Sequence, residues 1–261
     1  MSETAAVSAV YGPGMGFRLA LGPGGQFEFV LSGNAPPLFP QVELGRWRGE
    51  DEEGVRELLG AIAGCDEPSN PPPQPDSAYV FVGHERDGEK RERLYALYEA
   101  PPGWAPVQSA VLSMVHGRWL DRRQSTLRAQ ASWLKTQADA ARTIAVELDN
   151  PGSEVVSFSS PARQELWTVT LVPQWMAPAA LDTYPYEIAP HEFSLMSPLA
   201  VAQGSHALDP GKKIGVMLTL KRLLSPGRYD VSVQYLSEEV RGDARHASGI
   251  LTMSLAVLEV L

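Results

Sequence analysis

Apolar and polar residues alternate in short runs along much of the chain, and this pattern predicts β-strands. Residues 17–31, FRLALGPGGQFEFVL, place alternating apolar side chains on both sides of a Gly-Pro-Gly-Gly turn, which is the pattern of a hairpin. The runs AYVFVGHE and ERLYALYEA flank the charged turn RDGEK and predict a second hairpin. Two pairs of antiparallel strands are therefore expected in the first 100 residues.

Two stretches of the first half follow a helical spacing instead. In GEDEEGVRELLGAIAG, acidic residues open what would be a first turn and apolar residues then recur at helical intervals, which predicts a helix over about 51–63 that stops at Gly64. Residues 106–141 have no proline after Pro106, and Leu120, Leu127 and Leu134 recur at intervals of seven, so we predict helices over about 106–141. Between these stretches the proline-rich residues 66–77 predict an extended loop.

From Thr143 to the end, the pattern is that of one strand after another, separated by Pro, Gly, Asn and Asp. We place a domain boundary at about residue 142. The expected architecture is an α+β domain over 1–142, followed by an all-β antiparallel sandwich over 143–261. The predicted strands are TIAVEL, EVVSFSS, ELWTVTLV, FSLMSPLAV, KIGVMLTL, RYDVSVQYL and GILTMSLAVLEV.

The phrases LDPGKK and LSPGRY each place Pro-Gly before an apolar run, and we predict type II turns there because Gly supplies the positive φ of the second corner. The second phrase leads into alternating Tyr229, Val231, Val233 and Tyr235, which predicts one buried face. This strand, followed by SGILTMSLAVLEV, resembles the last two strands of immunoglobulin-like and fibronectin-III-like sandwiches. ELDNPGSEVVSF is similar to the opening strands of bacterial immunoglobulin-like domains. The resemblance implies a scaffold for contacts with other molecules, although the Cys…Trp…Cys spacing of true immunoglobulin domains is missing.

Charge and cysteine content narrow the functional classes. The formal net charge is −9, with 14 Lys and Arg against 18 Asp and Glu up to residue 142 and 8 against 13 after it. Net charge therefore gives no support to sequence-independent phosphate binding. Cys65 is the single cysteine, which rules out an internal disulfide bond. The N-terminal residues lack the pattern of a signal peptide, and no apolar stretch is long enough for a transmembrane segment, so a cytoplasmic location is expected.

Few motifs carry chemistry. The glycine-rich start lacks the Lys-Ser or Lys-Thr and the helix of a phosphate loop, there is no G-x-S-x-G sequence, and Cys65 lies beside two acids that would raise its pKa. We therefore expect a non-enzymatic accessory or adaptor protein without a cofactor, which binds another protein through the loops of its sandwich. Oligomerisation stays open. The expected contact residues come from aromatic positions in and near DTYPYEIAPHEF: Trp175, Tyr184, Tyr186 and Phe193.

Two other functions stay open. A metal-dependent hydrolase of unrecognised family would use His191, Glu192, His206 and Asp209, because imidazole and carboxylate are common metal ligands. A nucleic-acid binder would use a basic helix over 118–135 that carries Trp119 and Trp133, since basic side chains contact phosphates and aromatic rings stack on bases. Its basic residues are Arg118, Arg122, Arg123, Arg128 and Lys135.

Overall fold

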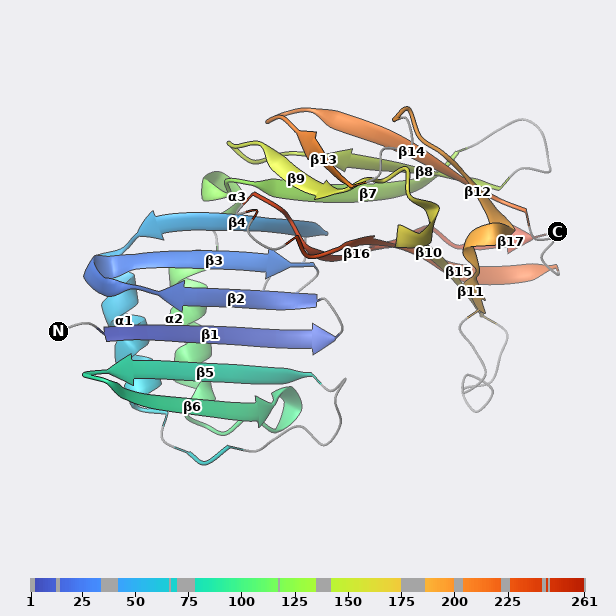
Figure 1. Ribbon diagram of the computed structural model, residues 1–261. Coiled ribbons are helices and arrows are strands. Elements are labelled where there is room, and N and C mark those ends of the chain that lie inside the picture. Colours follow the sequence, from blue (N-terminus) through green and yellow to red (C-terminus); the bar gives the residue numbers. More distant parts are fainter. Residues whose placement is uncertain are drawn as a thin grey trace.

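A computed structural model of the chain shows a protein built mainly from antiparallel β-strands (Figure 1). It describes residues 3–12, 15–33, 42–65, 67–69, 78–116, 118–134, 142–174, 186–199, 204–221, 226–240, 243 and 245–260. None of the helices in these ranges has the length and apolar character needed to cross a membrane.

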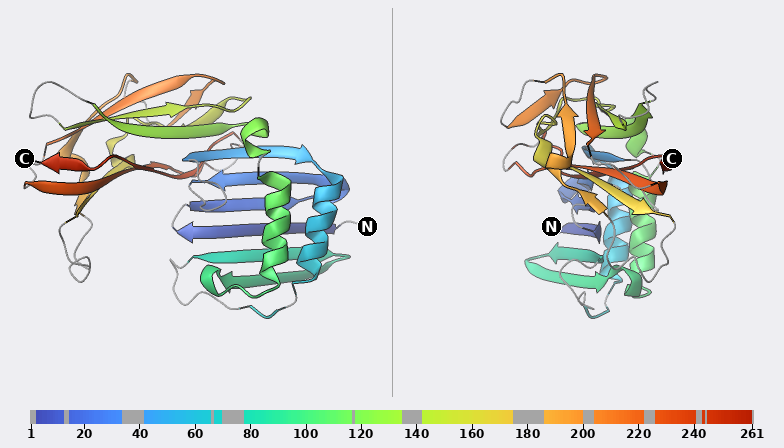
Figure 2. Two further views of the ribbon diagram at one scale, coloured as in Figure 1. Left: turned by 180° about the vertical axis from the view of Figure 1, so that it is seen from behind. Right: turned by 90° about the vertical axis from the view of Figure 1, so that its right-hand side faces the viewer.

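The first half contributes six strands that lie side by side in the order β4-β3-β2-β1-β5-β6. Every neighbouring pair is antiparallel. Helices α1 and α2 cover one face of this sheet, as the view from behind in Figure 2 shows. The bounds are β1 Glu3–Gly12, β2 Met15–Leu21, β3 Gln26–Ser32, β4 Glu43–Glu50, α1 Glu52–Ala63, β5 Tyr79–Arg86, β6 Glu89–Ala96 and α2 Trp104–Val115.

Helix α1 confirms the prediction for residues 51–63. It begins after Asp51, whose carboxylate accepts a hydrogen bond from the Gly54 N–H at 2.9 Å, and Asp is a preferred residue at this capping position. The helix ends at Gly64. Its apolar side packs on the sheet through buried Val55, Leu58 and Ile62.

The second half forms two facing sheets around a second core. One sheet has the order β12-β14-β8-β7 and the other β11-β10-β15-β16, with β17 paired to the far end of β15. Side chains of both sheets meet between them, as in sandwich folds. Within the second sheet, the rings of the cross-strand pair Trp167 and Tyr235 lie 4.6 Å apart in this core. The bounds are β7 Thr126–Leu134, β8 Thr143–Asp149, β9 Val156–Ser159, β10 Trp167–Pro173, β11 Tyr186–Ile188, β12 Phe193–Met196, β13 Ser205–Leu208, β14 Lys213–Leu220, β15 Gly227–Ser237, β16 Gly249–Ser254 and β17 Leu258–Val260.

The two halves share one continuous sheet. Strand β4 of the first half pairs with β7 of the second, with Glu43 opposite Arg128 and Leu44 opposite Leu127, so ten strands form a single hydrogen-bonded sheet. Short helix α3 (Trp119–Arg122) lies just before β7. Its Trp119 is buried in the first core. The predicted boundary near residue 142 therefore falls between β7 and β8, two neighbouring strands of one sheet.

The prediction of helices over 106–141 is only partly correct. Helices α2 and α3 lie in this range, but Thr126–Leu134 is strand β7, and residues 135–141 lie outside the described ranges. The interval of seven is a coincidence, because Leu127 is buried in the second core whereas Leu120 and Leu134 are 47% and 44% exposed. Pairing with both β4 and β8 determines the extended conformation.

Most of the other strand predictions are confirmed. Both early hairpins form as β2–β3 and β5–β6, and the seven later runs all contain strands. The alternating side chains of β15 are buried as expected. Gly211 has φ +72°, as the corner of a type II turn requires, whereas Gly227 has φ +150° and is already the first residue of β15. In the predicted loop over 66–77, only residues 67–69 are described.

Candidate functional site

The outer face of the sheet β12-β14-β8-β7, the face turned away from the second core, carries the first candidate site. Strand register places its outward side chains in four rows across the sheet. The rows are Arg128–Asp149–Lys213, Gln130–Glu147–Gly215, Ser132–Ala145–Met217–Met196 and Leu134–Thr143–Thr219–Ser194.

The middle two rows form a shallow cavity of about 830 Å³, which we call the outer trough. Its floor is low because Ala145 and Gly215 have little or no side chain, and a methyl group added at Gly215 would have no atom within 4 Å. Met196 and Met217, on two adjacent strands, line the trough with their apolar side chains, and Met196 is 64% exposed. Flexible methionine side chains of this kind adapt to the shape of a bound partner.

The charged groups of the outer face are already paired with one another. Arg128 donates two hydrogen bonds to the Asp149 carboxylate, at 3.0 and 2.6 Å. Lys213 Nζ lies 2.6 Å from Glu147 Oε1. The pKa of Lys213 is raised, mainly by this hydrogen bond. The trough itself therefore presents apolar and small polar groups beside two ion pairs, one of which includes Glu147 of its own lining.

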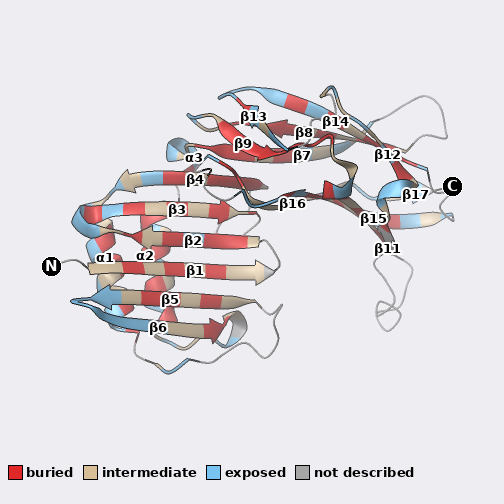
Figure 3. Cartoon of the chain, viewed as in Figure 1, coloured by how far each residue is buried: buried red, intermediate tan, exposed pale blue. Residues whose placement is uncertain are grey.

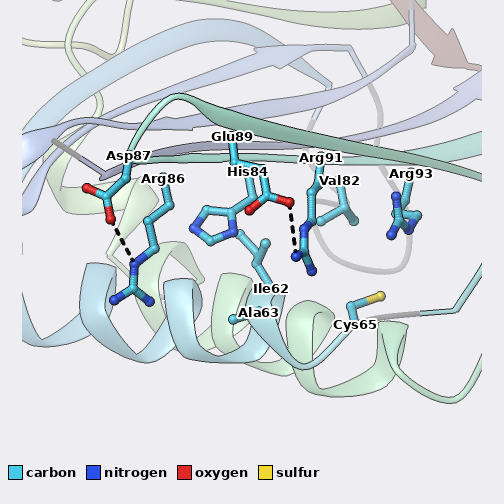
Figure 4. A pocket seen from close by; sticks show the side chains of 10 residues that line it. All are labelled: Ile62, Ala63, Cys65, Val82, His84, Arg86, Asp87, Glu89, Arg91 and Arg93. Atoms are coloured by element: carbon cyan, nitrogen blue, oxygen red, sulfur yellow. Dashed lines mark hydrogen bonds and ion pairs between the residues drawn. The ribbon is translucent and has the colours of Figure 1, made fainter.

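A second cavity, of about 370 Å³, lies between the β5–β6 hairpin and the C-terminal end of α1 (Figure 4). We call it the hairpin pocket. Its walls carry Arg86, Arg91 and Arg93, with Cys65 at one end. Burial raises the pKa of the Cys65 thiol, and the nearby Glu67 carboxylate acts in the same direction, as expected from its sequence neighbours.

A buried polar cluster near the junction of the halves was missed by sequence reasoning. Ser157 Oγ donates to Asp243 Oδ2 at 2.6 Å and lies 3.3 Å from His246 Nδ1, while His246 Nε2 lies 2.8 Å from the Glu238 carbonyl oxygen. The composition matches a catalytic triad, but here the carboxylate binds the hydroxyl instead of orienting the imidazole. The hydrogen bonds hold the chain around residue 246 against β9 and against the residue that follows β15, so the cluster stabilises the fold.

The predicted partner contacts are not brought together as expected. Trp175 and Tyr184 lie outside the described residues. Tyr186 begins β11, opposite Leu171 of β10. Phe193 is fully buried in the second core, where alternation along β12 turns it inward, so its prediction as an exposed contact residue is wrong.

The predicted metal ligands do not form a cluster. His191 and Glu192 lie in the short 3-10 turn Pro190–Glu192 before β12, and the Glu192 carboxylate accepts the Ala189 N–H at 3.0 Å. His206 lies in β13 with its ring packed edge-on against Phe158, and burial lowers its pKa. Asp209 follows β13. Among the residues that the structure describes, no three His, Cys, Asp or Glu side chains are grouped to hold a metal ion.

The predicted basic helix for nucleic acid does not exist as a unit. Arg118 and Arg122 lie at α3, but Arg128 lies in strand β7, and Lys135 is outside the described residues. Three of the arginines also have carboxylate partners. Besides the Arg128–Asp149 pair, Arg118 contacts Asp51 at 2.5 Å and Arg123 contacts Glu43 at 3.2 Å.

Comparison with known proteins identifies no family. No family model matches the sequence, and no curated protein matches it at a significant level. Among solved structures, a family 123 glycoside hydrolase from Clostridium perfringens is 12% identical, with a TM-score of 0.29 over 52% of this chain and 27% of that chain. The chain thus spans about a quarter of that enzyme's length.

Two smaller structures are similar at the same level. A PapD-like domain of human CEP192 is 12% identical, with a TM-score of 0.26 over 52% of this chain and 87% of that chain. AvmM, which catalyses macrocyclization in alchivemycin A biosynthesis, is 9% identical, with a TM-score of 0.21 over 51% of this chain and 86% of that chain. Similarities this low assign no activity to the chain, and its function has to be argued from its own surfaces.

Proposed function

We propose that the protein is a non-enzymatic accessory protein that binds an apolar segment of another protein in the outer trough. The proposal rests on one observation: Met196 and Met217 border a hollow that is floored by Ala145 and Gly215, on a sheet face whose other outward side chains are polar except for Leu134. Exposed apolar surface with a polar rim is typical of protein-binding sites, and methionine is enriched in them. The occupant is apolar because the neighbouring charges, Lys213 and Glu147, already neutralise each other.

The proposal includes the finer assignments of the two halves. We take the second half to be an immunoglobulin-like sandwich, supported by its two facing antiparallel sheets around one core. We take the first half to be an α+β unit, supported by two helices packed on one face of six strands. A cytoplasmic location remains part of the hypothesis. The metal-dependent hydrolase and the nucleic-acid binder gain no support from the described residues.

A filling substitution tests the proposal without removing any contact of the fold. Gly215→Leu places a side chain in the open space of the trough and should abolish partner binding while leaving the unfolding temperature nearly unchanged. Gln234→Leu on β15 is the control, because it places the same leucine side chain at an outward position of the opposite sheet. If Gly215→Leu retains the partner as well as Gln234→Leu does, the trough is not the binding surface.

Site-specific photo-crosslinking identifies what occupies the trough. A photoreactive residue at position 196 should attach to one other protein in stoichiometric amount, and the same residue at Leu236, which is 39% exposed on the opposite sheet, should not. Gly215→Leu should remove the adduct. Cross-linking to a second copy of this chain would show that the trough serves self-association and would refute the accessory function. Absence of any adduct at position 196 would also refute the proposal.

A further inference from the structure

The hairpin pocket lies on the helix-covered side of the sheet, at the end of β5 and β6. There the side chains that face the helices change from apolar to charged. Rows of β5 and β6 pair Val80 with Tyr95, then Val82 with Arg93, His84 with Arg91 and Arg86 with Glu89. The first row is buried in the core, and Figure 3 shows β6 changing from buried to exposed along its length. The pocket opens where the rows become charged, beside Ile62 and Ala63 of α1.

Most cations of the pocket already have an anionic partner. Arg91 Nη2 lies 3.2 Å from Glu89 Oε1, and Arg86 Nε lies 3.8 Å from Asp87 Oδ2 (Figure 4). His84 Nε2 lies 2.8 Å from Glu3 Oε1 on the neighbouring strand β1. The residues that line the pocket thus carry three guanidinium groups and two carboxylates, and Arg93 is the arginine for which no carboxylate partner is described.

Arg93 differs from the other two arginines. Its Nη1 donates to the Glu92 carbonyl oxygen at 3.1 Å, but its Nε is buried and has no hydrogen-bond partner among the residues that the structure describes. A buried N–H of a charged group without an acceptor is costly, so Arg93 is the least compensated of the three arginines that line the pocket. A guanidinium group is suited to an oxyanion because its planar fork matches carboxylate and phosphate geometry.

The apolar residues that line the pocket indicate what the uncharged part of the ligand is. Ile62, Ala63, Val82 and Cys65 form the apolar wall opposite or beside Arg93. The cavity of about 370 Å³ has the size of pockets that bind small molecules. It therefore fits a small molecule with an acidic group at one end and a short apolar body.

We propose that the hairpin pocket binds a small organic anion, whose carboxylate or phosphate group contacts Arg93 and whose apolar part lies on Ile62 and Val82. This site is separate from the outer trough, which lies on the other half of the protein. The guanidinium group of Arg93 lines the pocket and supplies the positive charge that the oxyanion contacts. If the arginines only stabilised the hairpin, their loss would lower stability and no anion would bind.

Titration calorimetry on the full chain at low ionic strength tests the proposal with hexanoate, hexyl phosphate and inorganic phosphate as probes, and with hexanol as the neutral control. Hexanoate or hexyl phosphate should bind, and whichever binds more tightly identifies the acidic group. Inorganic phosphate should bind more weakly than hexyl phosphate, and hexanol should not bind. Absence of binding by both hexyl anions, or equal binding of hexanol, would overturn the proposal.

Matched arginine variants separate a specific site from general charge attraction. Arg93→Met removes the guanidinium group but retains an unbranched apolar side chain. It should weaken anion binding by about tenfold or more through loss of a charge-assisted hydrogen bond. Arg48→Met removes the same charge from an exposed position of β4 and should leave binding unchanged. Equal weakening in both variants would show non-specific attraction and overturn the proposal.

A second pocket variant guards against misfolding of Arg93→Met. Ala63→Phe adds a ring at the exposed end of α1 beside the pocket without changing any charge. It should also block the anion, with the unfolding midpoint close to that of the unmodified chain. Unchanged binding in Ala63→Phe would place the anion outside the pocket and overturn the proposal.

Discussion

Removing one charge of the buried Glu43–Arg123 pair should destabilise the protein far more than removing both. Glu43 is fully buried in β4, where its carboxylate accepts hydrogen bonds from Trp119 Nε1 at 2.8 Å and Arg123 Nη1 at 3.2 Å. The Arg123 side chain is 12% exposed. The pair lies where the two halves meet, so its loss affects the junction of the fold.

The expected loss in the free energy of unfolding depends on which of the two charges remains buried. Breaking a buried pair by removing one partner costs about 3–5 kcal/mol, because the other charge stays buried without compensation. Glu43→Gln keeps an acceptor for Trp119 and leaves the slightly exposed Arg123, so we expect about 3 kcal/mol. Arg123→Met leaves the fully buried Glu43 carboxylate and should cost closer to 5 kcal/mol. The double variant contains neither charge and should lie within about 2 kcal/mol of the unmodified chain.

Urea unfolding followed by circular dichroism measures these differences through the midpoint and the m-value. Glu147→Gln is the control, because its pair with Lys213 is exposed and should contribute no more than about 1 kcal/mol. Two results would refute the reasoning. Either both single variants cost less than about 1 kcal/mol, or the double variant loses as much as the two single variants together.

Three further substitutions test separate parts of the fold. Phe193→Ala should lower the free energy of unfolding in urea by about 3–5 kcal/mol, because the ring is fully buried. A near-neutral result would show that the ring is not part of the core. Gly249→Ala should lower the thermal midpoint, since φ is +138° and a methyl group would lie 2.8 Å from the Ser32 carbonyl oxygen; an unchanged midpoint contradicts this. The Ser157 hydroxyl holds the pKa of Asp243 below its usual range, so this carboxylate stabilises the fold above the ordinary aspartate pKa. Asp243→Asn should therefore destabilise the protein at pH 7, and the difference from the unmodified chain should shrink as pH falls below about 4; a difference independent of pH would refute this.

Strands with large alternating side chains could be predicted from the sequence, as β15 shows. Strand β7 was missed although Leu127, Ala129 and Ala131 alternate with polar residues, because leucines at intervals of seven suggested a helix. Its conformation depends on partners on both sides, which lie about 15 and 80 residues away in the chain. Strand β1 was also missed, although Ala5, Val7 and Ala9 do alternate toward the core.

Predicting a candidate site from the sequence requires the register of the paired strands, whereas predicting a single strand does not. The outer trough combines Ala145, Met196 and Gly215 from three strands, and only their pairing places these residues side by side. Phe193 was expected at the surface because the sequence does not say which face of a short strand is buried. The hairpin pocket left one usable signal, since Arg91 and Arg93 share the alternation of Tyr95, a side chain expected to point inward.

The pairing of β4 with β7 has a practical consequence for anyone who divides this chain into fragments. A piece beginning at residue 143 would lack β7, so it would lose buried Leu127 and Ala129 and leave β8 as a bare edge. A piece ending before residue 126 would expose the edge of β4. Bare edges with free backbone groups pair readily with other chains, so both fragments should aggregate where the intact protein does not.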